Sequence, residues 1–223
     1  MKYSRRRFFR EALGGVAAVA VAGQILKPTA SAHTVLSPDA AVQQLIAGNG
    51  RFVEGRMMLF DEDLGILRAK TAEKQEPFAA VLSCADSRMP IELIFDQSIG
   101  HVFVTRVAGN IATSAMIASL EYGVTVLGTK AIMVLGHANC GAVKASIEAK
   151  AVPGQISTLY PYIRPAVDQA GPDLEATIKA NAKIQAGLLR QSSPVLAEHI
   201  KQNQLKIVAA YYDLASGKVT VLD

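Results

Sequence analysis

Short apolar runs that alternate with helical patterns are the feature of this sequence that most restricts its fold. Four runs have the length of a buried strand, and they span residues 77–83, 102–107, 130–135 and 205–211. Patterns typical of helices lie between them, over residues 114–127, 140–150, 173–190 and 193–202. Strands that alternate with helices form parallel sheets with helices on both faces. The sequence therefore predicts an α/β fold with a mostly parallel central sheet.

The two ends of this α/β region carry signals of their own. Ser37 precedes Pro38 and predicts the start of a helix over residues 38–54, which would form an N-terminal helical arm. At the other end, a turn at Ser216 leads into a short strand over residues 218–222, which we expect to pair antiparallel with the four parallel strands. The proline-rich residues 151–172 predict a looser connection. No linker divides residues 33–223, so a single domain is predicted.

The first 32 residues have the pattern of an export signal. Basic residues that include the pair Arg5-Arg6 precede an apolar stretch of Ala, Val and Gly, and the small residues Ala30-Ser31-Ala32 follow. The segment resembles a twin-arginine signal, so we expect cleavage after Ala32 and a periplasmic protein. An uncleaved membrane anchor is the alternative, but the apolar run is shorter than the roughly 20 residues that a span needs.

The basic charge of the chain belongs to this first segment. The whole sequence has a formal net charge of +4, whereas residues after the signal carry 17 basic and 18 acidic side chains. A domain without excess positive charge lacks the electrostatic footprint of a nucleic-acid-binding protein. We therefore expect no nucleic-acid partner. Because the signal would be removed by cleavage, we also expect no stable membrane anchor.

Residues that carry chemistry follow two of the predicted strands. Cys84, Asp86 and Arg88 come after the first apolar run, and at alternating positions of an extended chain they would face the same side. His137 and Cys140 come after the third run. Ligand sites of open α/β sheets lie at the carboxyl ends of the strands. The sequence therefore predicts that both groups meet at one edge of the sheet.

Two thiolates and one imidazole are donors that suit zinc and leave its fourth position free. Zinc lowers the pKa of a bound water to about 7, which makes hydroxide available at neutral pH. Asp86 could be the fourth ligand, or it could pair with Arg88 and accept a hydrogen bond from that hydroxide. The alternatives are a disulfide between the only two cysteines, Cys84 and Cys140, a plain ion pair, and ordinary core packing.

The combination of residues 84–88 (CADSR) with residues 137–141 (HANCG) resembles the β-class carbonic anhydrases. These zinc enzymes interconvert carbon dioxide and bicarbonate. The resemblance extends over the chain after the signal and includes residues 49–52, 95–97, 106–110, 211–214 and 217–219. It implies one zinc ion per chain, with Cys84, His137 and Cys140 as ligands and Asp86 as the fourth ligand of a closed form.

The resemblance also implies the remaining parts of a catalytic site. Asp86 and Arg88 would form the catalytic dyad that orients zinc-bound hydroxide for attack on carbon dioxide. The substrate-binding residues would be Gln75, Phe103, Tyr122 and Gly141. Val81 occupies the place of a tryptophan found in the bicarbonate-inhibited subgroup, which favours the plant-like subgroup.

Members of this family form dimers or larger assemblies with the active site at the subunit interface. We therefore expect a homodimer or higher homo-oligomer, with the helix over residues 38–54 reaching across the partner. Two further functions stay open at this point. One is hydrolysis of carbonyl sulfide or carbon disulfide on the same scaffold, and the other is zinc or bicarbonate binding without turnover.

Overall fold

The computed structural model describes residues 34–59 and 64–222. The predicted export signal, its arginine pair and its cleavage site lie outside the described residues. In the part of the chain that is described, no helix combines the length and apolar character required to cross a membrane. The described residues belong to one compact unit, which comprises residues 31–223.

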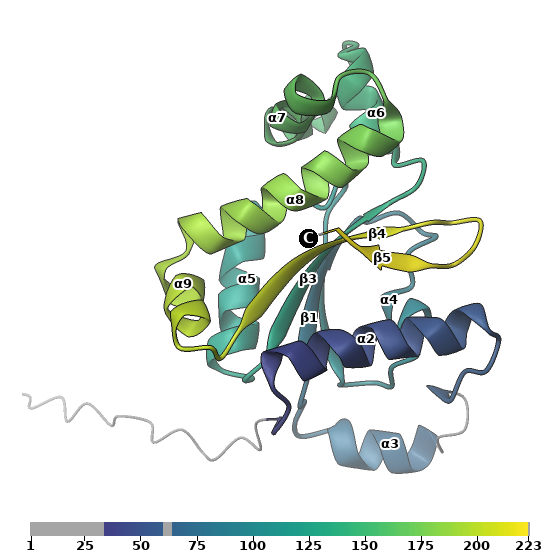
Figure 1. The fold of residues 1–223 in the computed structure, drawn as a ribbon, viewed down its shortest axis with the longest axis vertical. Helices are drawn as coiled ribbons and strands as arrows, with labels where there is room; N and C mark the ends of the chain where they lie inside the picture. Colours follow the sequence, from purple (N-terminus) through teal and green to yellow (C-terminus); the bar gives the residue numbers. More distant parts are fainter. Residues whose placement is uncertain (1–33, 60–63, 223) are drawn as a thin grey trace, which may run out of the picture. The chain divides into compact units, whose positions relative to one another are not determined.

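A five-stranded sheet forms the centre of this unit (Figure 1). Its strands lie in the order β2-β1-β3-β4-β5, with bounds Val102–Arg106, Ala79–Ser83, Ala131–His137, Lys206–Tyr212 and Val219–Val221. The first four strands are mutually parallel, and β5 pairs antiparallel with β4. The predicted α/β fold, with four parallel strands and one short antiparallel strand, is confirmed.

Helices cover both faces of the sheet. Helix α2 (Pro38–Val53) begins at the predicted cap, where the Ser37 hydroxyl accepts a hydrogen bond from the amide of Ala40. Its residue Leu45 packs against the face that carries Val81 and Met133. The opposite face packs against α5, α8 and α9, which span Ser114–Thr125, Leu174–Ser192 and Pro194–Lys201. Burial on both faces explains why the strands read as continuous apolar runs.

Helix α2 buries one face against the sheet of its own chain. Ala41, Val42 and Leu45 form its apolar stripe, and all three are buried against the sheet of the same chain. The opposite side of the helix, which includes Gln43 and Gln44, is exposed in this chain. That the helix reaches across a partner subunit stays a prediction.

The predicted loose connection over residues 151–172 is wrong. It contains the short 3₁₀ helix η2 (Ile156–Leu159) and the helix α7 (Tyr160–Ala170). Pro161 lies in the first turn of α7, where a missing N–H costs nothing because that group has no partner within the helix. Ile163 and Ala166 are fully buried, so tertiary packing holds the helix despite Pro165 in its interior.

Three shorter helices complete the fold of the described residues. They are α3 (Leu64–Thr71), α4 (Ile91–Ile94) and α6 (Gly141–Glu148). The first two were not predicted, because an element of one or two turns has too few residues for a periodic pattern. Helix α6 begins directly after Cys140, so this cysteine of the second predicted cluster lies in the turn between β3 and α6.

The register of the sheet determines where the predicted clusters lie. Ser83, the last residue of β1, pairs with Leu135, and β3 continues for two further residues to His137. Cys84 follows β1 directly, so it lies at the same sheet edge as His137. The parallel strands thus bring the two clusters together, as the sequence predicted.

Candidate metal centre

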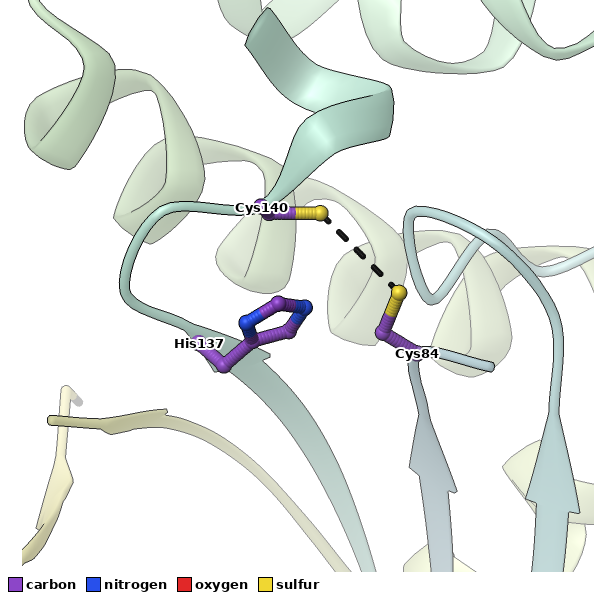
Figure 2. A group of neighbouring side chains, drawn as sticks. All are labelled: Cys84, His137 and Cys140. Atoms are coloured by element: carbon purple, nitrogen blue, oxygen red, sulfur yellow. Dashed lines mark hydrogen bonds between the residues drawn. The ribbon is translucent and has the colours of Figure 1, made fainter. Parts of the chain in front are cut away.

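Three potential metal ligands converge at the carboxyl edge of the sheet (Figure 2). Cys84 follows β1, His137 ends β3, and Cys140 directly precedes α6. Their ligand atoms all lie within 4.8 Å of one another. Cys84 is 5% exposed and the other two are fully buried, so bulk water does not compete for these positions.

The orientation of His137 fits metal binding. Its Nδ1 lies 2.9 Å from the carbonyl oxygen of Ala138, which can only accept, so Nδ1 carries the proton. Nε2 then has a free lone pair. This atom is buried without a hydrogen-bond partner among the described residues. A buried, unpaired imidazole nitrogen beside two sulfurs is the arrangement that a bound cation would complete.

The two sulfurs are free thiols that lie 4.0 Å apart. A disulfide bond has a length of about 2.05 Å, so the structure does not contain the disulfide considered as an alternative. The hydrogen bond from the Cys140 thiol lowers the pKa of Cys84, whereas that shared proton and burial raise the pKa of Cys140. A metal ion that binds both sulfurs displaces the protons that they carry.

Asp86 and Arg88 form a bidentate ion pair beside these three residues. The Arg88 Nε donates to Oδ1 over 2.9 Å, and its NH2 group donates to Oδ2 over 2.7 Å. The guanidinium group holds the pKa of Asp86 well below its usual range. Oδ2 of Asp86 lies 3.9 Å from Nε2 of His137. The carboxylate is thus next to the three potential ligands while it remains paired with Arg88.

The path of the chain between these two residues differs from the extended segment that we expected. It turns at Ser87–Arg88, where the backbone amide of Arg88 also donates to Oδ1 of Asp86 over 2.9 Å. The turn, and not alternation along a strand, brings the guanidinium back to the carboxylate. The short polar side chain of Asp86 favours such a turn by bonding to the backbone two residues later.

Arg106 is part of the site, although the sequence analysis gave it no role. It ends β2, and its Nε donates to the carbonyl oxygen of Cys84 over 3.0 Å. Its NH2 group donates to the carbonyl oxygen of Asp86. Arg106 therefore fixes the backbone on both sides of Ala85. Its position at the end of the neighbouring apolar run is the signal that could have identified it.

The predicted substrate-binding residues do not join the cluster of their own chain. Gln75 is exposed and precedes β1, so it lies at the end of the strand opposite Cys84. Phe103 pairs with Ala80, four residues before Cys84, which corresponds to roughly 13 Å along the strand. The ring of Tyr122 on α5 lies 6.3 Å from that of Phe103 and is about half exposed.

Gly141 lies next to Cys140, and no other part of its own chain approaches it closely. A Cβ atom at this position would meet nothing within 4 Å. The packing of this chain therefore does not require glycine at position 141. A role in substrate binding stays a prediction.

The fold and the site together define a metal-site protein of the α/β class. A family model described as carbonic anhydrase matches residues 79–219. The chain belongs to this family, and its similarity to solved structures assigns it to the β class of carbonic anhydrases.

Relatives with high coverage support this assignment. Carbonic anhydrase 2 of Mycobacterium tuberculosis is 35% identical over 84% of this chain and 94% of the relative. A carbonic anhydrase of Mycolicibacterium smegmatis is 34% identical over 82% and 92%. Among solved structures, the β-carbonic anhydrase CafA of Aspergillus fumigatus has a TM-score of 0.66 at 27% identity, over 72% of this chain and 82% of CafA. The Coccomyxa enzyme has a TM-score of 0.63 at 28% identity, over 71% and 77%.

Proposed function

We propose that this enzyme catalyses the reversible, zinc-dependent hydration of carbon dioxide to bicarbonate and a proton. One observation carries the proposal, namely that three ligand atoms lie within 4.8 Å of one another beside a carboxylate that Arg88 holds. Cys84, His137 and Cys140 would hold the ion, because two thiolates and one imidazole match the preference of zinc. Bound there, zinc would supply a water molecule that is activated at neutral pH.

The residues of the chain have separate tasks in this reaction. Asp86 is ionised, so its oxygens can only accept hydrogen bonds, and Oδ2 faces the side of His137. It would therefore accept a hydrogen bond from the reacting water and orient that water for attack. Arg88 keeps the carboxylate on its own guanidinium and away from the ligand position. Of the two roles considered for Asp86, the geometry supports the pairing with Arg88.

The surroundings of the site suit an apolar substrate. Val107, Ile111 and Ala138 pack in the same cluster as the two cysteines. Carbon dioxide has no net charge and no hydrogen to donate, so an apolar wall costs it little on leaving water. Bicarbonate, in contrast, gains from polar donors, which this apolar wall does not offer.

Substrate-binding residues from a second subunit would complete the site. Gln75, Phe103 and Tyr122 lie away from the cluster of their own chain, and Tyr122 is about half exposed. We propose a homodimer in which these residues line the partner's site.

We also propose that the chain belongs to the plant-like subgroup, and that residues 1–32 direct its export to the periplasm.

Hydration of carbon dioxide by the purified protein tests the proposal, measured by stopped flow together with metal analysis. We expect about one zinc per chain, loss of activity on chelation and recovery with zinc. A parallel assay with carbonyl sulfide and carbon disulfide separates the hydrolase alternative. A zinc-loaded, folded protein without carbon dioxide turnover would contradict the proposed reaction.

A further inference from the structure

Helix α8 has an unusual face for a helix in a hydrophobic core. Thr177, Asn181 and Gln185 follow one another at intervals of four residues, so they share one side of the helix. None of the three side chains is more than 1% exposed. Burial of a polar side chain is unfavourable unless hydrogen bonds replace its contacts with water. The partners of these residues therefore indicate why polar groups are present here.

Two of the three side chains hold the segment that leads from β2 to α5. The amide Nδ2 of Asn181 donates to the carbonyl oxygen of Gly109 over 2.9 Å. Oε1 of Gln185 accepts from the backbone amide of Ala112 over 2.9 Å. Gln185 also donates to Oδ1 of Asn181 over 3.2 Å and thereby fixes the orientation of that amide. The two hydrogen bonds to Gly109 and Ala112 each join residues more than 70 positions apart in the sequence.

The held segment reaches the metal centre at Gly109. The backbone amide of this residue donates to Sγ of Cys84 over 3.4 Å. Gly109 has a φ of +79° and Asn110 a φ of +46°, so the backbone here is in the left-handed region. A Cβ at position 109 would lie 2.7 Å from Cδ1 of Ile163. Helix α8 on one side and Ile163 of α7 on the other thus confine this peptide.

We propose that Asn181 is a positioning residue of the metal centre, which holds Gly109 so that its N–H donates to the sulfur of Cys84. This inference rests on the proposed metal site. A hydrogen bond to a coordinating thiolate stabilises its negative charge and fixes the direction of its lone pairs. Asn181 thus acts on the metal through a backbone amide and touches neither the metal nor the substrate.

Asn181→Asp is the informative substitution. Aspartate has the shape of asparagine and keeps an acceptor for Gln185. Burial raises the pKa of a carboxyl, so the measurements are made above that pKa, where the ionised side chain has no donor for Gly109. Thr177→Val is the matched control. Thr177 lies one turn away on the same buried face, and its hydroxyl donates to the carbonyl oxygen of Gly171, which is not part of the metal centre. Both variants lose one buried hydrogen bond.

Metal binding distinguishes a positioning role from a structural one. We expect Asn181→Asp to bind Zn²⁺ roughly 10-fold more weakly in competition with a chelator, as is usual when a partner of a ligand is lost. Its Co²⁺ form should show a shifted thiolate-to-cobalt charge-transfer band. Thr177→Val should keep the Zn²⁺ affinity and the charge-transfer band of the wild type, even if its melting temperature falls as much as that of Asn181→Asp. Equal affinities and bands in Asn181→Asp and the wild type would overturn the proposal.

A measurement on the wild-type protein does not depend on whether the variant folds. In the ¹¹³Cd-loaded protein, the amide proton of Gly109 should show a scalar coupling to cadmium across the hydrogen bond to Cys84. Absence of this coupling overturns the proposed hydrogen bond. A wild-type protein that binds neither Co²⁺ nor Cd²⁺ contradicts the metal site itself, and so the two failures are distinguishable.

Discussion

Oδ2 of Asp86 lies 3.9 Å from Nε2 of His137. This separation is too long for a hydrogen bond. It is short enough that a small movement of Asp86 would carry its oxygen to any ion that the imidazole binds. The ion pair with Arg88 opposes this movement, because both carboxylate oxygens accept hydrogen bonds from the guanidinium group. Arg88 therefore controls whether Asp86 can reach a bound ion.

Cys140→Ser is expected to lose most of the metal. The substitution replaces a soft thiolate by a hydroxyl that binds zinc poorly. Loss of an outer-shell partner alone costs about 10–100-fold in metal affinity, so loss of a direct ligand should exceed this range. Metal analysis after dialysis measures the effect. Ser146→Ala on α6, the helix that follows Cys140, is the control. Full zinc content in Cys140→Ser would remove Cys140 from the site.

Arg88→Ala is expected to keep its metal and lose activity near neutral pH. Without its partner, Asp86 is free to occupy the ligand position of the reacting water. A loss of about 10²–10⁴-fold in carbon dioxide hydration is typical of one catalytic interaction. Arg164→Ala removes an exposed ion pair with Asp168 and serves as the control. Near wild-type rates in a folded, zinc-loaded Arg88→Ala protein would show that the dyad has no catalytic role.

Mixing two inactive variants tests the shared site. Cys140→Ser lacks a metal ligand, and Tyr122→Ala lacks a residue that would line the partner's site. Each mixed dimer would then contain one site with both defects and one intact site. After unfolding and refolding together, about a quarter of the wild-type activity should return, since half of randomly paired dimers are mixed. If Tyr122 serves its own chain, the mixture stays inactive.

Asp96 should make stability depend on pH in the acid range. Its side chain is fully buried. Burial raises the pKa of this carboxyl, but hydrogen bonds from Arg51 and the amides of Met58 and Leu59 outweigh that effect and lower it. A lowered native pKa stabilises the fold above the pKa of the unfolded chain, ~3.9, and this contribution is lost as the pH falls.

Asp96→Asn is therefore expected to lower the free energy of unfolding by about 2–4 kcal/mol at pH 7, because Arg51 loses its partner. The difference from the wild type should shrink below about pH 4, where the wild type loses the same contribution. Urea unfolding across this range measures both. Asp39→Asn, which removes an exposed pair with Lys206, should cost less than about 1 kcal/mol. A difference that does not vary with pH would contradict the role of the Asp96 charge.

Export should depend on the arginine pair. Substitution of Arg5 and Arg6 by lysine keeps the charge but removes the guanidinium pattern that a twin-arginine receptor would recognise. The doubly substituted precursor should stay in the cytoplasm, as cell fractionation would show. Efficient export of this precursor would favour the general secretion route.

The sheet and the ligand cluster were predictable for a common physical reason. Buried parallel strands require continuous apolar runs, and their carboxyl ends meet at one edge. Cys84 and His137 each follow or end such a run, so their meeting follows from the fold. Helix α7 was not predictable in this way, because Pro161 and Pro165 obscure its pattern and the packing of Ile163 stabilises it.

The hydrogen bonds of α8 that position the backbone near the ligands could not be predicted from the sequence. Asn181 and Gln185 bond to backbone groups more than 70 positions away, and no spacing rule connects such partners. The place of Gln75, Phe103 and Tyr122 was equally hidden. Strand register and exposure, which only the structure provides, separate these residues from the cluster of their own chain.

The three ligands come from two distant parts of the chain. Cys84 directly follows β1, whereas His137 ends β3 and Cys140 follows it. Residues 85–136 between them contain α4, β2, α5 and most of β3. An ion bound to all three closes this long loop and acts as a cross-link. Closing a loop lowers the entropy of the unfolded chain, and binding to the folded state alone shifts the folding equilibrium toward it. The ion that serves the chemistry would thus also cross-link the ends of β1 and β3, and its removal would lower the free energy of unfolding.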